Sequence, residues 1–204
     1  MPSRTAAAND LNRLDRRRAR TRAQLLEAGR RLFAAKGFHG TKIADIAAAA
    51  DLGTGTFYLH FPTKDALFAD LVRETAQRAL GEIDRAKAPV ADPREKARVG
   101  MEAFFRFAAS NREVFKILFG QSARFDDLVR EIHQLFLADI EANHGAGIAA
   151  GVFTPCRPAL MAQAIVGMLS QVVAWWLEHQ DVPIDEITET IHRLLMHGSA
   201  VQEA

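Results

Sequence analysis

Apolar residues recur along this chain at steps of three and four positions, which is the spacing of one face of an α-helix. Runs of alternating Val, Ile and Thr, the usual mark of strands, are absent from the sequence. Glycines, prolines and short polar residues divide the pattern into segments. We therefore expect an all-α protein whose helices span about 17–36, 41–50, 54–60, 63–86, 94–109, 112–121, 125–150, 158–179 and 184–197.

The first 65 residues have the clearest helix boundaries. The apolar face of the first helix ends at Lys36, and Gly37 follows as a typical stop. Thr41 is predicted to cap the second helix, because a Thr hydroxyl can accept a hydrogen bond from an N–H that has no partner inside the helix. Pro62 ends the third helix, and Thr63 is expected to cap the fourth.

Two short helices joined by a three-residue break, after a longer helix, fit the geometry of a helix-turn-helix. The break is residues 51–53, and Asp51 can adopt the positive φ of a compact turn, though less easily than Gly. The helix at 54–60 would then be the one that enters the major groove of a duplex. Phe57 and Phe61 lie four residues apart on one face, so we expect them in the core.

Charge separates the chain into two parts, although the formal net charge of the whole is only +1. Residues 1–62 contain 11 Lys and Arg against 5 Asp and Glu, whereas residues 63–204 contain 15 against 20. This balance favours a polyanionic partner for the first part, and a solvated basic tail is the alternative explanation. We divide the chain into a flexible basic tail at 1–16, a helix-turn-helix domain at 17–62 and a helical body at 63–204.

An ordered set of residues between Thr21 and Leu71 makes this interpretation specific. The set is Thr21-Arg22, Leu25-Leu26, Ala28, Leu32-Phe33, Gly37-Phe38, Thr41, Ile43, Ile46-Ala47, Ala50, Gly55-Thr56-Phe57-Tyr58, His60-Phe61 and Lys64-Asp65-Ala66-Leu67. This segment, about a quarter of the chain, resembles the DNA-binding domain of the tetracycline-repressor (TetR) family. Two positions depart from the family: Asp51 stands where members usually have Gly, and Gly53 where they often have Ser.

The resemblance implies an N-terminal three-helix DNA-binding domain followed by a C-terminal helical domain for ligand binding and dimerisation. It implies a ligand-responsive transcriptional regulator that is not an enzyme. Because repression is the commoner role in the family, we expect a repressor that a small hydrophobic effector releases from a palindromic operator. The implied DNA-contacting residues are Thr41, Lys42, Thr54, Gly55, Thr56, Tyr58, His60 and Lys64.

The body is expected to hold the effector and to pair with a second subunit. Eight of the 13 Phe lie between Phe104 and Phe153, which favours an apolar effector, although core packing is the plainer explanation for each of them. Candidate effector-contacting residues are Phe104, Phe107, Gln121, Arg124, His133 and Trp175. A homodimer is expected through helices 158–179 and 184–197, with half-sites on DNA about 34 Å apart or at multiples of this. The second of these helices supplies Ile184, Ile187, Ile191, Leu194 and Leu195.

Three other functions stay open at this point. An activator of the same fold would have the same sequence features. Cys156, the single cysteine, precedes an arginine that can lower a thiol pKa, as in a redox-responsive regulator. The pairs Glu141–His144 and Glu189–His192 have the spacing found in helical metal enzymes, but the further Glu ligands such enzymes need are not evident. We expect no metal or other cofactor.

One segment has the length of a membrane span, because residues 158–177 carry no charged side chain. Wound as a helix, it has one side of polar and small residues that includes Gln163, Gly167 and Gln171, which favours a buried or subunit-interface helix. The first residues contain charges without the apolar run of a signal peptide. We therefore expect a cytoplasmic protein without a membrane partner.

Overall fold

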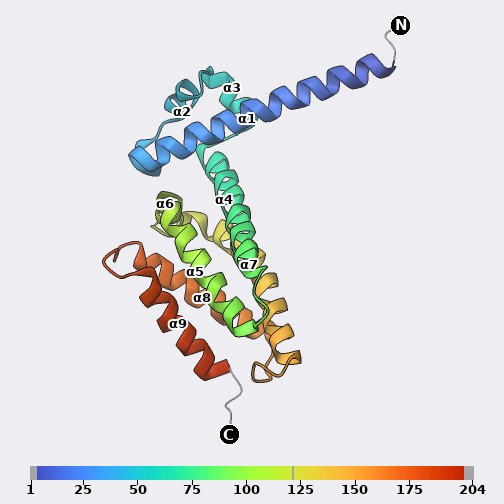
Figure 1. Cartoon of the computed structure of the whole chain (residues 1–204). Coiled ribbons are helices and arrows are strands. Elements are labelled where there is room, and N and C mark those ends of the chain that lie inside the picture. The colour runs from blue at the N-terminus through green and yellow to red at the C-terminus, as the bar shows by residue number, and fades with distance from the viewer. Residues whose placement is uncertain (1–3, 121, 200–204) are drawn as a thin grey trace. The chain divides into compact units, whose positions relative to one another are not determined.

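The structure, a computed structural model, describes residues 4–120 and 122–199 (Figure 1). The described residues form nine helices: α1 (Arg4–Gly40), α2 (Ile43–Ala49), α3 (Thr54–His60), α4 (Lys64–Lys87), α5 (Pro93–Ser110), α6 (Arg112–Gly120), α7 (Ser122–Ala149), α8 (Pro158–Trp176) and α9 (Ile184–Ser199). The predicted all-α class is confirmed, and each predicted helix has its counterpart.

α1 starts earlier than the sequence pattern indicated. Its backbone is helical from Arg4, so the predicted tail at 1–16 is helical from that residue onward instead of irregular. Residues 4–28 contain neither Gly nor Pro and are rich in Ala and Arg, which are strong helix formers. At the other end Gly37 adopts φ 68° and ψ 175° and interrupts the helix at the predicted stop.

The chain divides into two compact units, of which the first ends at Val72 and the second begins at Arg73. Both residues belong to α4. In the first unit, α1, α2, α3 and the start of α4 surround a buried core. The core includes Leu25, Leu26, Phe33, Phe38, Ile46, Phe57, Phe61, Leu67 and Phe68.

Aromatic rings and one close helix approach define the packing of this first core. Phe33 and Phe68 meet edge to face with 5.6 Å between ring centroids, and Phe38 lies 5.4 Å from Phe68 in the same way. Such edge-to-face pairs are a preferred arrangement of aromatic side chains. A Cβ on Gly29 of α1 would lie only 2.6 Å from Cδ2 of Leu67 on α4, so glycine permits this contact between the two helices.

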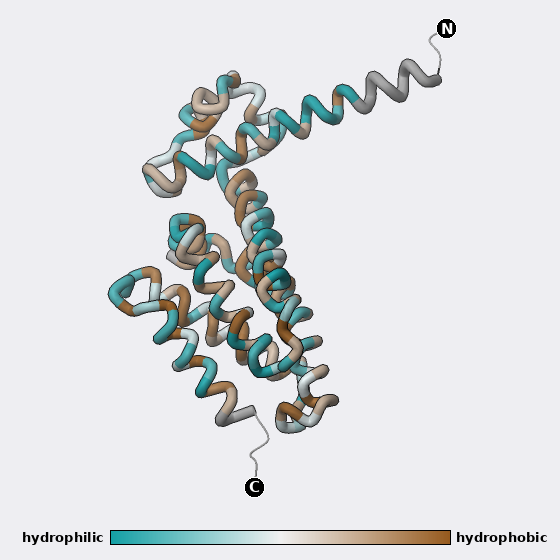
Figure 2. The backbone as a smooth tube through the Cα atoms, in the orientation of Figure 1, coloured by the Kyte–Doolittle hydropathy of each residue, from teal (hydrophilic) through white to brown (hydrophobic). Residues whose placement is uncertain are grey.

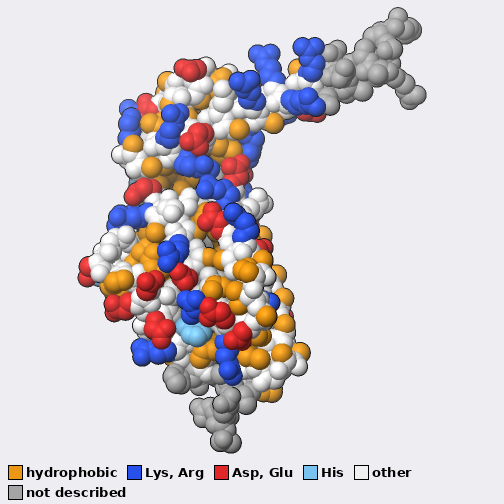
Figure 3. All heavy atoms as spheres, viewed as in Figure 1, with side chains coloured by type: hydrophobic (Ala, Val, Ile, Leu, Met, Phe, Trp, Pro, Cys, Tyr) orange, Lys and Arg blue, Asp and Glu red, His pale blue; other side chains and the backbone are white. Residues whose placement is uncertain are grey.

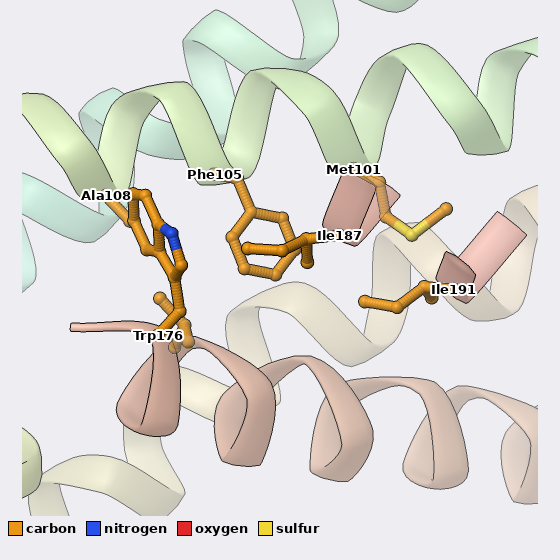
Figure 4. Close-up of a cluster of buried hydrophobic side chains, with 7 residues drawn as sticks. Met101, Phe105, Ala108, Trp176, Ile187 and Ile191 are labelled. Carbon is orange, nitrogen blue, oxygen red and sulfur yellow. The ribbon is translucent and has the colours of Figure 1, made fainter. Parts of the chain in front are cut away.

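The second unit contains the rest of α4 and helices α5 to α9. Its main buried cluster joins α5, α8 and α9 (Figure 4), and apolar turns alternate with polar ones along these helices (Figure 2). The buried members are Met101, Phe105, Ala108, Val173, Trp176, Ile187 and Ile191. Ile187 and Ile191 thus pack inside their own subunit, which corrects the expectation that they lie between subunits. The sequence shows that α9 has an apolar face, but it does not show which surface covers that face.

Two ion pairs connect α4 to α7 within the second unit. Nε of Arg73 lies 2.6 Å from Oε1 of Glu131, and both side chains are about half exposed. Nζ of Lys87 lies 2.7 Å from both carboxylate oxygens of Asp139. Lys87 is only 9% exposed, so the second pair is nearly buried.

Candidate nucleic-acid interface

The turn between α2 and α3 has the compact form that a helix-turn-helix needs. Asp51 adopts φ 55°, which confirms the predicted positive φ at this residue. Asp is one of the few residues other than Gly that tolerate this conformation. The N–H of Leu52 donates to the carbonyl of Ala47 at 2.9 Å, and Gly53 then precedes α3 in an extended conformation. The turn keeps its geometry with Asp in the place of the glycine that is usual in the family.

α3 is anchored on one side and exposed on the other. Phe57 has no exposed surface and Phe61 is 1% exposed, which confirms that both belong to the core. The outer side of the helix is formed by Thr54, Gly55, Tyr58 and Leu59. Thr56 and His60 lie at the margin between the two sides and are half-buried. A helix held in this way presents small and hydroxylated groups to a partner.

Gly55 and Leu59 have no role in the packing of the unit. A Cβ on Gly55 would meet no atom within 4 Å, so nothing inside the chain requires glycine there. Glycine inside a helix costs about 0.5–1 kcal/mol relative to Ala, and its presence fits the close approach of another molecule. Leu59 is 73% exposed. Sequence reasoning missed Leu59; its signal is an apolar residue two positions from the buried Phe57, and therefore on the opposite side of the helix.

Thr41 has a different place from the one expected. Its side chain is fully buried, and Oγ1 lies 2.8 Å from the carbonyl oxygen of Gly37 and 3.2 Å from that of Leu32. The hydroxyl therefore donates to the end of α1 and does not cap α2, which begins at Ile43 with Lys42 as its N-cap residue. The expected contact between this side chain and DNA would need an exposed hydroxyl, and here the hydroxyl is buried.

Lys64 also makes contacts inside its own unit. Its Nζ donates to the carbonyl oxygens of Phe38 at 2.6 Å and Thr41 at 2.8 Å, and lies 4.3 Å from the centre of the Phe38 ring. The carbonyl of Phe38 lies in the last turn of α1 and that of Thr41 directly follows the helix. A positive charge is favourable at the C-terminal end of a helix. Any phosphate would compete with them for this ammonium. Thr63 accepts a hydrogen bond from the N–H of Ala66 at 3.0 Å, which confirms its predicted cap.

His60 lies beside basic side chains of α1. Burial lowers the pKa of its imidazole, and the positive charges of Arg18 and Arg22 act in the same direction. Arg22 lies 5.3 Å from the centre of the Phe61 ring and forms an ion pair with Asp70. A neutral imidazole still has one N–H, so His60 keeps the ability to donate to a phosphate oxygen.

The structure thus sorts the eight predicted DNA-contacting residues into three groups. Thr54, Gly55 and Tyr58 share the exposed face of α3, and Lys42 is exposed at the start of α2. Three are half-buried, namely Thr56, His60 and Lys64. Thr41 is buried.

The predicted effector-contacting residues do not gather in one place. Phe104 is partly buried, and its ring lies 6.1 Å from that of Phe115 and 6.0 Å from that of Phe136. Phe107 is 2% exposed and lies under the guanidinium of Arg78, so it belongs to the core. The aromatic cluster of Phe104, Phe115 and Phe136 therefore brings α5, α6 and α7 together.

Two further candidates, Trp175 and Arg124, are exposed. Trp175 is 45% exposed and stacks on His179, with 4.4 Å between ring centroids. Gln121 lies outside the described residues.

His133 is the predicted effector-contacting residue with a specific polar partner. Its Nε2 lies 2.8 Å from Oγ of Ser170, so the pair joins α7 to α8. Burial lowers the pKa of His133, which favours the neutral imidazole. His133 is three residues before Phe136 and shares its helix face. Sequence reasoning missed Ser170, because a serine in an apolar helix gives no sign of which helix it faces.

Cys156 is exposed and has a histidine beside it. Its Sγ lies 3.4 Å from Nε2 of His144, which is buried and stacked on Phe153. Burial lowers the pKa of His144. In the part of the chain that the structure describes, no three His, Cys, Asp or Glu side chains gather as a metal site would require.

Comparisons with known proteins match both units. A model of bacterial regulatory proteins of the tetR family matches residues 25–71, and a model of the tetracyclin repressor-like C-terminal domain matches residues 90–199. The HTH-type transcriptional regulator YhgD of Bacillus subtilis is 26% identical over 176 residues, which cover 84% of this chain and 90% of YhgD.

Solved structures give the same fold. A TetR-family transcriptional regulator of Syntrophomonas wolfei is 25% identical, with a TM-score of 0.75 over 88% of this chain and 96% of that one. The regulator FadR of Bacillus subtilis, solved with stearoyl-CoA, is 20% identical, with a TM-score of 0.75 over 86% of this chain and 98% of FadR.

Proposed function

We propose that this chain, which belongs to the tetR family of bacterial regulatory proteins, is a helix-turn-helix transcriptional regulator that acts as a repressor. In this proposal a dimer in the cytoplasm holds a palindromic operator. A small apolar effector binds the body and releases the operator. The exposed face of α3 is the observation that carries the proposal.

The composition of that face favours duplex DNA as the partner. Gly55 allows the helix backbone to come close to the groove, and the hydroxyls of Thr54 and Tyr58 can donate to phosphate or base oxygens. Leu59 adds an apolar group of the kind that contacts the methyl group of thymine. Lys42 supplies a positive charge at the start of α2.

The surface of α8 supports the proposed dimer. Among the described residues α8 is the one helix long and apolar enough to cross a membrane, and only 22% of its apolar stretch is buried in the subunit. Its exposed positions recur at helical spacing and include Leu160, Gln163, Ala164, Gly167, Gln171 and Trp175. A Cβ on Gly167 would meet nothing within 4 Å, which leaves room for a second helix. We place the two-fold interface on α8 and on the outer side of α9, where Leu194 is 63% exposed.

For the effector we propose a site beside Phe104, Phe115 and Phe136, with His133 and Ser170 as its polar pair. The three rings are partly buried and belong to different helices, so an apolar ligand among them would contact α5, α6 and α7 together. The neutral imidazole of His133 suits an uncharged hydrogen-bonding group on the ligand better than it suits a carboxylate.

The ion pairs between α4 and α7 provide a route from this site to the DNA-binding unit. His133 lies on α7 between Glu131 and Asp139, which bind Arg73 and Lys87 of α4. A ligand that displaces α7 therefore pulls on α4, and α4 begins inside the DNA-binding unit. To release DNA, the effector must bind the displaced state more tightly than the DNA-bound state.

Selection of duplexes from a random library with the purified full-length protein tests the proposal. We expect a palindrome to be enriched and to shift on a native gel as a complex with two subunits. Effectors with an apolar part should reverse the shift, and acyl-CoA thioesters, whose acyl chain is apolar, are the first class to try, because FadR was solved with stearoyl-CoA. The double variant Thr54→Ala/Tyr58→Ala should lose the shift, whereas Gln134→Ala, an exposed change on α7, should keep it.

Two results would contradict the proposal. If the library yields no enriched duplex at low salt, the protein is not a sequence-specific DNA binder. If the operator complex forms only when the effector is present, the protein is not a repressor of the proposed kind. A Cys156→Ser variant that no longer responds to peroxide would instead favour redox control through the Cys156–His144 pair.

A further inference from the structure

The N-terminal part of α1 projects from the DNA-binding unit beyond α2 and α3 (Figure 1). We call residues 13–20 the arm. Every residue of the arm is exposed, whereas Leu25 and Leu26, which follow it on α1, are buried. The arm therefore takes no part in the core.

The arm is strongly basic. It carries five arginines, at positions 13, 16, 17, 18 and 20, and one acidic residue, Asp15. Lys and Arg side chains follow this part of α1 on the surface (Figure 3). Four of the arginines recur at the spacing of one helix face, namely Arg13, Arg16, Arg17 and Arg20.

The like charges of the arm destabilise the helix that carries them. Arginines three and four positions apart on one helix face repel each other. Folding therefore gives no reason for the pattern. Binding to a polyanion removes the repulsion and gives the exposed charges a partner.

The arm lies next to the end of α3. Arg18 of the arm and Arg22, which follows it, both act electrostatically on His60 in the last turn of α3. The arm and α3 both belong to the first unit. Eight residues of α-helix extend about 12 Å, and duplex DNA carries a phosphate charge for about every 1.7 Å of its axis.

We propose that the arm binds the phosphates of the DNA that flanks the segment held by α3. This inference rests on the proposed DNA-binding function and adds an interaction that does not read the base sequence. Each arginine paired with a phosphate releases counterions, so the arm steepens the dependence of DNA affinity on salt. The arm should strengthen binding to any duplex without changing which sequence is preferred.

Replacement of the five arm arginines by Gln tests this proposal in the full-length protein. Gln is also a good helix former, so the helix is kept while its charge is removed. The matched control replaces five exposed arginines of the body, at positions 78, 85, 106, 124 and 130, by Gln. Circular dichroism and thermal unfolding establish that both variants are folded. Binding is measured by fluorescence anisotropy between 50 and 300 mM salt, on the selected operator and on a 40-base-pair duplex of mixed sequence.

We expect the slope of log affinity against log salt to become shallower by about 0.9 for each phosphate that the variant no longer neutralises. Removal of one arginine–phosphate pair from each arm of a dimer would change the slope by about 2. The change should be similar on both duplexes, and the control should keep the slope of the parent protein. An unchanged slope in the arm variant, with the parent protein still bound to DNA, would overturn this inference alone. If the parent protein binds neither duplex at low salt, the proposed function fails as well.

Discussion

The end of α1 in the first unit and the contact of α4 with α7 in the second are held by different kinds of polar contact. In the DNA-binding unit, the side chains of Thr41 and Lys64 bind main-chain carbonyls at the end of α1. In the body, the pairs Lys87–Asp139 and Arg73–Glu131 join side chain to side chain across α4 and α7. A hydrogen bond to the main chain fixes a helix end, whereas two long side chains can follow each other when a helix shifts. The first unit also contains the ion pair of Arg22 with Asp70, so the contrast holds for the end of α1 and for the contact of α4 with α7.

The exposed surfaces of the two units differ in the same way. The outer face of α3 carries the hydroxyls of Thr54 and Tyr58, and the same unit carries a basic arm, so it suits a wet, charged partner such as DNA. The outer face of α8 carries large apolar groups such as Leu160 and Trp175, so it suits a dry protein partner. The exposed surface of the first unit thus suits DNA, and the exposed surface of the second unit suits another protein subunit.

The largest effects should come from the core of each unit. Phe57→Ala and Phe105→Ala each remove a fully buried ring, and each should destabilise its own unit by about 3–5 kcal/mol. Phe57→Ala should abolish DNA binding and leave effector binding in place, because α3 is then no longer anchored. Thermal unfolding together with calorimetric effector binding checks this. Loss of effector binding in Phe57→Ala would show that the units do not fold separately.

The two ion pairs of α4 should differ in strength. Asp139→Ala leaves the nearly buried ammonium of Lys87 with only the exposed carboxylate of Asp84, 3.9 Å away, which should cost about 3 kcal/mol. Arg73→Ala breaks a pair that is about half exposed, so it should cost less than about 1 kcal/mol. Urea unfolding of the two variants measures both values. Equal costs would contradict the inference that the Lys87 end of α4 is held more firmly.

The hydroxyl of Thr41 should stabilise the DNA-binding unit. Thr41→Val keeps the shape of the side chain but leaves carbonyls at the end of α1 without their donor, which should cost about 1–2 kcal/mol. Thr41→Ser keeps the hydroxyl and should recover most of this stability. Thermal unfolding compares the two variants. If Thr41→Val is as stable as the parent but binds DNA poorly, the hydroxyl contacts DNA as the family resemblance implies.

The smallest effect should be a pH dependence of stability, to which His60 of the DNA-binding unit contributes together with two histidines of the body. Burial lowers the pKa of His133 and His144 below the ordinary value of 6.5, so the unfolded chain binds protons more readily than the folded one. The free energy of unfolding should therefore decrease as the pH falls below about 6.5. His133→Gln should weaken this decrease in urea unfolding between pH 7 and 5. His39→Gln, a change of an exposed histidine, is the control and should leave it unaltered.

The breaks that end α1, join α2 to α3 and begin α4 could be predicted because their determinants are local, whereas the start of α1 could not. Gly37 and Asp51 adopt positive φ, and Thr63 caps α4, at the positions that the sequence indicated. The partners of Thr41 and Lys64 could not be predicted. A hydroxyl or an ammonium near a helix end has the same sequence signature whether it faces a phosphate or a main-chain carbonyl.

In the body the helices could be predicted, but their neighbours could not. The apolar face of α9 was evident from the spacing of Ile187 and Ile191, yet only packing shows that α5 covers it. The pair of His133 and Ser170 joins residues 37 positions apart, and nothing in the local pattern of either helix points to the other. A ligand site depends on such long-range contacts. The sequence therefore indicated that aromatic residues would line the site, but it did not indicate which of them come together.

Hydroxyl-radical footprinting of the selected operator tests the central claim most directly, namely that two α3 helices of a dimer lie in the major groove of duplex DNA. We predict two protected tracts related by two-fold symmetry, with centres about 34 Å or a multiple of this apart. Both tracts should disappear in the Thr54→Ala/Tyr58→Ala variant. A single unsymmetrical tract, or protection that survives this variant, would contradict the claim.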